Sequence, residues 1–101
     1  MGQKASLQYQ YYDLGDLRSN QIIEVGLGYT ANVRIMDNPN YSKFKSGRSY
    51  RYLGGYVTQS PYYAVIPENA HWYVIVDLGG YTGKIKSYVK VLSGKLPPAT
   101  Q

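Results

Sequence analysis

The chain has no cysteine and only one histidine (His71), one tryptophan (Trp72) and one phenylalanine (Phe44). The absence of cysteine excludes a disulfide framework, a thiolate metal site and a thiol nucleophile. A single histidine leaves too few ligands for a transition-metal site within one chain. These shortages favour a non-enzymatic protein that uses no cofactor and no metal.

Long hydrophobic runs are also missing. No stretch approaches the roughly 18 apolar residues that a membrane-spanning helix needs, and no apolar segment follows the polar start of the chain as it does in a secretory signal. We therefore expect a cytoplasmic protein that does not bind membranes.

Tyrosine, in contrast, is in excess, because 13 of the 101 residues are tyrosines. A single domain of this length buries roughly 65% of the surface that its unfolded chain exposes, so several tyrosines must stay exposed or contact a partner. Tyrosine is enriched at the energetic centres of protein interfaces. The tyrosine excess therefore predicts a contact surface for a second copy of the chain or for another protein.

The charge is distributed unevenly along the chain. The formal net charge is +5, yet residues 38–67 contain no acid, and none follows Asp77. Two stretches, 41–52 and 84–95, are rich in lysine or arginine. This asymmetry indicates an anionic partner or a complementary subunit.

Alternation of apolar and polar residues dominates the chain and predicts short strands. We expect them over residues 6–12, 21–28, 31–37, 48–53, 60–66, 71–78 and 84–92. Residues 71–78 are apolar on both faces, which is typical of a central strand covered on both sides. The prolines that flank 60–66 favour an edge strand.

The connections between these strands are predicted from glycine, proline and asparagine. Residues 28–30 and 79–83 are read as hairpin connections, and Gly15 as the start of a turn. Residues 37–40 break the preceding strand. Residues 41–47 could form a single helical turn that ends at Gly47, and the Gly54-Gly55 pair indicates a bulge or bend.

The fold class that follows is all-β: a single antiparallel β-sandwich or a partly open barrel of seven to eight short strands. It spans residues 6–92, between a disordered N-terminal tail (1–5) and a disordered C-terminal tail (93–101).

Several motifs together resemble a known family. They are the segment 31–37, the Gly54-Gly55 pair, Ser60-Pro61, the segment 71–80 and the early Tyr12-Asp13-Leu14-Gly15. In order and spacing they are similar to the bacterial domain-of-unknown-function family eighteen-eighty-three (DUF1883), whose members are small all-β domains found alone or upstream of TIR domains. The resemblance spans residues 9–92 and implies an all-β fold. It carries no established activity to any residue, but it implies a sensing or scaffold role beside an NAD-consuming TIR immune effector.

Two candidate surfaces follow from the residues. The first is an interaction surface of clustered aromatic and basic side chains: Arg48, Tyr50, Arg51, Tyr52, Tyr62, Tyr63 and Tyr88. The second is a row of cations on the outward face of the last strand, Lys84, Lys86 and Lys90, with Tyr88 among them. Such a row suits an anionic ligand or single-stranded nucleic acid, although lysines also protect exposed strands from edge pairing.

Two catalytic interpretations are weak. Gly26–Ala31 has the spacing of a dinucleotide-binding fingerprint, but a strand pattern follows it where the fingerprint needs a helix. His71 and Asp77 share a strand face but lie about 20 Å apart at the rise of a strand, so they cannot form a dyad.

The leading hypothesis is therefore a non-enzymatic protein-interaction or self-assembly module that forms homo-oligomers or binds a protein partner. The alternatives are a binder of an anionic ligand or single-stranded nucleic acid, and a carbohydrate-binding module.

Overall fold

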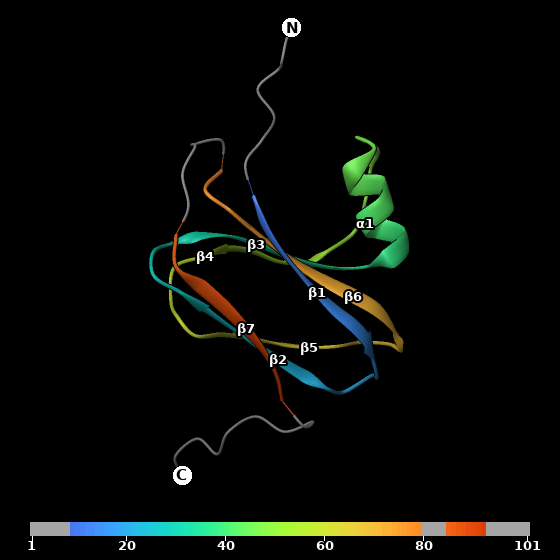
Figure 1. The fold of residues 1–101 in the computed structure, drawn as a ribbon, viewed down its shortest axis with the longest axis horizontal. Coiled ribbons are helices and arrows are strands. Elements are labelled where there is room, and N and C mark those ends of the chain that lie inside the picture. Colours follow the sequence, from blue (N-terminus) through green and yellow to red (C-terminus); the bar gives the residue numbers. More distant parts are fainter. Residues whose placement is uncertain (1–8, 80–84, 93–101) are drawn as a thin grey trace, which may run out of the picture.

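The computed structural model describes residues 9–79 and 85–92, which form seven antiparallel strands in two sheets and one short helix (Figure 1). The elements are β1 (Gln10–Leu17), β2 (Ile22–Leu27), β3 (Ala31–Asp37), α1 (Asn38–Lys45), β4 (Leu53–Val57), β5 (Tyr62–Val65), β6 (Ala70–Asp77) and β7 (Ser87–Leu92). The described strands form no closed barrel, so the sandwich alternative is confirmed. The tails predicted at 1–5 and 93–101 lie outside the described residues.

The two sheets differ in size. A four-stranded sheet has the order β1-β6-β3-β4, and a three-stranded sheet has the order β5-β2-β7. β2 and β3 belong to different sheets, as do β6 and β7, so both predicted hairpins are wrong. Each connection thus joins strands of different sheets, although residues 80–84 of the second lie outside the described residues. A short loop can span the roughly 10 Å between packed sheets as readily as it can reverse the chain within one sheet.

The core lies between the inner faces of the two sheets. Alternate side chains of β2, β3 and β6 fill it, and most are fully buried: Ile23, Val25, Val33, Ile35, Trp72, Val74 and Val76. At the margin beside β1 and β7, Gln10 Nε2 donates to the Ser87 hydroxyl over 2.8 Å. This bond ties the edges of the two sheets together.

The predicted central strand is confirmed as β6, which pairs with β1 on one side and β3 on the other. Its Trp72, Val74 and Val76 face the sandwich core. Its Tyr73 and Ile75 face the opposite way, where they pack with Tyr41 and Phe44 of α1. β5 is an edge strand, as its flanking prolines predicted.

The helix begins earlier than predicted. Asp37 is its N-cap, because the Asp37 side chain accepts a hydrogen bond from the Asn40 backbone N–H over 3.2 Å. Pro39 lies in the first turn, where no backbone N–H is needed. The segment interpreted as a break is therefore the start of α1, because asparagine, aspartate and proline favour turns and helix starts alike.

β4 begins at Leu53 and contains the two glycines, so the predicted strand over 48–53 is wrong. Residues 48–52 pass beside α1 without pairing in a sheet. β1 also runs on through Gly15, whose φ of 74° accommodates a register shift in the pairing with β6. Gly15 therefore marks a β-bulge and not a turn.

Candidate functional site

Aromatic side chains gather on the outer face of the four-stranded sheet, around α1. This aromatic cluster consists of Tyr9, Tyr11, Tyr41, Phe44, Tyr50, Tyr52, His71 and Tyr73. Tyr41 lies at its centre, with its ring centroid 4.0 Å from that of Tyr73. Sequence alternation keeps Tyr9, which directly precedes β1, on the same side as Tyr11 of β1. The structure shows that this side points towards α1 and away from the sandwich core.

Phe44 connects the helix to the segment that follows it. Its ring packs edge-to-face against Tyr9 and Tyr50, each at a centroid distance of 5.2 Å. The Tyr50 ring in turn lies 5.7 Å from that of Tyr52. These contacts hold residues 48–52 beside α1 even though they belong to no sheet.

The Tyr41 phenol, at the centre of the cluster, is a weaker acid than a free tyrosine. Burial, together with the nearby phenols of Tyr9 and Tyr11, raises the pKa of Tyr41 to about 12. Free tyrosine phenols ionise near pH 10. The folded protein therefore keeps a proton between about pH 10 and pH 12 that the unfolded chain loses, so the free energy of unfolding must fall as the pH rises through this range.

We expect this shift to appear in an ultraviolet titration of phenolate absorbance. The wild-type curve should contain a late component near pH 12 that is missing from a Tyr41→Phe variant. Identical high-pH ends of the two curves would show that Tyr41 is not buried as described.

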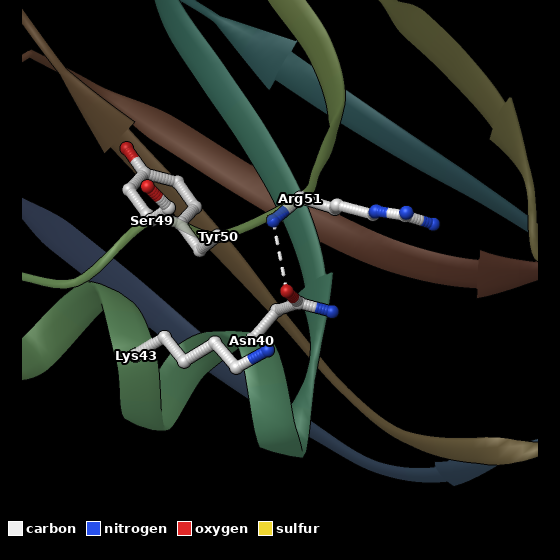
Figure 2. Close-up of a pocket in the computed structure, with 5 residues that line it drawn as sticks. All are labelled: Asn40, Lys43, Ser49, Tyr50 and Arg51. Atoms are coloured by element: carbon white, nitrogen blue, oxygen red, sulfur yellow. Dashed lines mark hydrogen bonds between the residues drawn. The ribbon is translucent and has the colours of Figure 1, made fainter.

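A cleft lies between α1 and the segment 49–51 (Figure 2). Its volume is about 420 Å³, and its lining residues are Asn40, Lys43, Ser49, Tyr50 and Arg51. Asn40 Oδ1 accepts a hydrogen bond from the Arg51 backbone N–H over 2.8 Å, and Asn40 Nδ2 donates to Asp37 Oδ1 over 2.7 Å. Asn40 therefore fixes both walls of the cleft relative to each other. We call this the helix-side cleft.

The helix-side cleft is basic. Lys43 and Arg51 line it, no acid does, and neither residue forms an ion pair within the part of the chain that the structure describes. A second groove of about 340 Å³ shares Asn40 and Arg51 with it. That groove is lined by apolar side chains as well as by Asp37 and Glu68.

Beyond the cluster, the outer face of the four-stranded sheet is held together by the Arg34–Asp77 ion pair. Partial burial alone would raise the pKa of Asp77, but hydrogen bonds from Asn32, the Gly79 backbone N–H and Arg34 outweigh it and lower this pKa. The Arg34 guanidinium lies 5.7 Å from the centre of the Tyr52 ring. Asp77 is therefore the partner of Arg34 in a structural ion pair.

The outer face of the three-stranded sheet has a different character. Its central feature is Tyr88, which pairs directly with Gly26 across β2 and β7. A Cβ atom added at Gly26 would lie 1.9 Å from the Tyr88 ring, so the ring covers the glycine. The Tyr88 hydroxyl donates to Glu24 Oε2 over 2.6 Å, and Lys90 Nζ lies 5.3 Å from the centre of the ring. We call this surface the three-stranded face.

Glu24 influences a second tyrosine on the three-stranded face. Its hydrogen bond to Tyr88, followed by partial burial, raises the pKa of Tyr88, and burial followed by the contact with Glu24 raises that of Tyr63. Both phenols therefore remain neutral hydrogen-bond donors to a higher pH than a free tyrosine does.

The residues predicted as one interaction surface are divided between these places. Arg48, Tyr50, Arg51 and Tyr52 lie in the segment after α1, whereas Tyr63 and Tyr88 lie on the three-stranded face. Tyr62 packs against the sandwich core. Of the predicted cation row, Lys86 and Lys90 are exposed, and Lys84 lies outside the described residues.

His71 has partners that sequence reasoning missed. Its Nε2 lies 2.5 Å from Asp13 Oδ1 and its Nδ1 lies 3.5 Å from Asp16 Oδ1. A hydrogen bond from the Gly15 backbone N–H, and then the contact with His71, lower the pKa of Asp13. Only the β1–β6 register could have revealed this cluster, because His71 is far from both aspartates in sequence.

The described part of the chain lacks two further features. No group of three His, Cys, Asp or Glu side chains is placed to hold a metal ion, and no helix within it has the length and apolar character needed to cross a membrane.

Comparison with curated proteins and with solved structures gives no match. Comparison with protein families gives one: the model of the family described as Domain of unknown function (DUF1883) matches residues 7–95. This range covers most of the chain, including all seven strands and the helix. The chain therefore belongs to the DUF1883 family.

Proposed function

We propose that this domain is a non-enzymatic interaction module that self-associates through its three-stranded face. The observation that carries the proposal is the state of Tyr88, which is 42% exposed and yet held in place by Gly26 and Glu24. An aromatic ring that is positioned before binding loses little conformational freedom in an interface. Such rings are frequent centres of binding energy.

The edge strands of the three-stranded sheet supply further exposed apolar area. Val65 on β5 lies on the same face as Tyr88, farther along the sheet, and is 50% exposed. Val91 on β7 is 40% exposed, although it pairs with the core residue Ile23 and so belongs to the inner face. Both strands are edges of the three-stranded sheet, and no described element packs on them from outside. Exposed edges with apolar side chains favour association with another chain.

A second copy of this chain is the partner that suits the face best. Glu24 and Lys90 pair across β2 and β7, so the face carries one charge of each sign beside its tyrosines. In a two-fold symmetric contact the same patch meets itself, and each acid can then lie near the base of the other copy. An assembly of this kind agrees with the scaffold role beside a TIR effector that the family resemblance implies.

The test is the solution mass from light scattering at low and high salt. The wild-type chain should give a stable multiple of 11.4 kDa under both conditions, because apolar and aromatic contacts resist screening. Tyr88→Ala should weaken the association by about tenfold or more. Tyr29→Ala is the matched control, since Tyr29 is 70% exposed on the β2–β3 connection, and it should leave the mass unchanged.

A second variant tests the position of the ring and not only its presence. Gly26→Ala would displace the Tyr88 ring and break its bond to Glu24, so it should weaken association in the same direction. A monomer under both salt conditions, or equal effects of Tyr88→Ala and Tyr29→Ala, would refute self-association through this face.

A further inference from the structure

We propose that the helix-side cleft binds a small phosphomonoester, with the phosphate between Lys43 and Arg51 and the organic group in the adjoining groove. The cleft lies on the outer side of the four-stranded sheet, so this site is separate from the three-stranded face and independent of the proposed self-association. Its volume of about 420 Å³ falls within the range of small-ligand sites.

The charge of the cleft matches a dianion. Lys43 comes from α1 and Arg51 from the segment that passes beside it, so each wall of the cleft contributes one cation. In Figure 2 the Arg51 side chain extends sideways from its segment and not directly towards Lys43. Neither is neutralised by a carboxylate in the described residues, and Arg48 adds a third cation nearby in the chain. A phosphomonoester carries a charge of about −1.5 to −2 at neutral pH. Two cations therefore suit a phosphomonoester better than they suit a carboxylate, which carries a single charge.

The neutral residues of the cleft contribute less than its cations. Ser49 and Tyr50 line the cleft, but Figure 2 shows their hydroxyl groups turned away from Lys43 and from the Arg51 guanidinium. Charge-assisted hydrogen bonds from lysine and arginine are the strongest that a phosphate accepts. The proposed recognition of phosphate therefore rests on Lys43 and Arg51.

The two walls of the cleft are held in place before any ligand binds. Asn40 fixes the Arg51 backbone to the first turn of α1, and the Phe44–Tyr50 contact joins the same two walls nearer the end of the helix. Tyr41 anchors the helix itself on the sheet. A site assembled before the ligand arrives avoids the cost of ordering two mobile segments on binding.

The adjoining groove decides where the rest of the ligand lies. It shares Asn40 and Arg51 with the cleft, and its walls include Tyr52, Leu53 and Trp72. Asp37 and Glu68 also line it, so an anion is disfavoured there and the phosphate is confined to the basic cleft. The apolar walls suit a flat or ring-shaped organic group, and the two acids suit hydrogen-bond donors on that group.

The experiment is a calorimetric or NMR titration of the full chain with three probes: inorganic phosphate, adenosine monophosphate and uncharged adenosine. Adenosine monophosphate should bind most tightly, because it fills both parts of the site, and adenosine should bind at least about tenfold more weakly. Chemical-shift changes should be concentrated at Asn40, Lys43 and residues 49–53.

Two variants and one matched control assign the binding to this cleft. Lys43→Ala and Arg51→Ala should each lower the affinity for adenosine monophosphate by about tenfold. Lys86→Ala removes the same charge from an exposed position before β7 and should not change it. All three exposed substitutions should leave the circular dichroism spectrum and the mass from light scattering unchanged.

Three outcomes would overturn the proposal. The first is no binding of any phosphate probe at millimolar concentration. The second is an equal loss in Lys86→Ala and Lys43→Ala, which would indicate only non-specific attraction to a basic protein. The third is tighter binding of single-stranded oligonucleotides that grows with their length, which would indicate a nucleic-acid groove. None of these outcomes changes the test of self-association, which is read from the mass alone.

Discussion

Gly54→Ala is expected to lower the free energy of unfolding by about 3–4 kcal/mol. The residue has a φ of +111°, a conformation that alanine rarely adopts. A Cβ atom there would also lie only 2.2 Å from the Val33 carbonyl oxygen. Val33 is fully buried in β3 between two neighbouring strands, so its backbone cannot move aside without loss of strand pairing. Urea denaturation followed by circular dichroism measures the change.

Gly55→Ala is the matched control for this prediction. Its φ of +149° also strains an alanine, but nothing lies within 4 Å of the position of a Cβ atom. Its substitution should therefore cost only the backbone strain, about 1–2 kcal/mol. Equal losses in the two variants would mean that the contact with Val33 does not contribute and that β4 is not packed against β3 as described.

Tyr41→Ala is expected to cost about 3–4 kcal/mol, because Tyr41 is the one aromatic side chain of α1 that is fully enclosed. It is 7% exposed and stacks on Tyr73, and it also contacts Tyr11 and Phe44. Without it, the short helix loses its main attachment to the sheet. Eight residues are too few for an isolated helix to be stable in water. Thermal unfolding, together with amide exchange in residues 38–45, measures the effect.

Tyr41→Phe separates the ring from its hydroxyl group. Phenylalanine keeps the stacking and the volume, so the loss should be below about 1 kcal/mol. If the proposed phosphate site is correct, Tyr41→Ala should also abolish binding of adenosine monophosphate, whereas Tyr41→Phe should retain it. A Tyr41→Ala protein with normal amide protection in α1 would contradict the anchoring role.

Most of the strands, though not β4, and the central position of β6 could be predicted because they depend on local alternation. Residues 71–78 are apolar on both faces, and the structure covers both, one with the sandwich core and the other with α1. The burial of the inward residues of β2 and β3 could be predicted from the same alternation. A strand that is covered on both faces has apolar residues on both faces, so its own sequence indicates the two contacts.

The pairing of the strands could not be predicted in this way. Short glycine-containing loops before β3 and β7 fit a hairpin and a crossing between sheets equally well, and the structure uses the crossing in both cases. Gly54 is another example. The Gly54-Gly55 pair indicates a bend in the sequence, but the need for glycine at position 54 depends on the Val33 carbonyl of a neighbouring strand.

The candidate sites show the same division. The acid-free, basic and aromatic stretch was visible in the sequence, and part of it lines the helix-side cleft. The separation of Tyr50 from Tyr88, and the meeting of Asp13 with His71, were not visible, because they follow from strand order and register.

The sequence by itself determined that this chain is a small all-β domain, where its apolar strand faces lie and how its charge is distributed, because these properties depend on residues close together in the chain. Only the tertiary structure decided which tyrosines are enclosed by α1, which cover a glycine on the three-stranded face, and which cations share a cleft. Those outcomes depend on pairings between residues far apart in sequence, such as Gly26 with Tyr88 and Asn40 with Arg51. Many strand orders satisfy the same alternation, and the packing of both sheets and the helix together selects one of them.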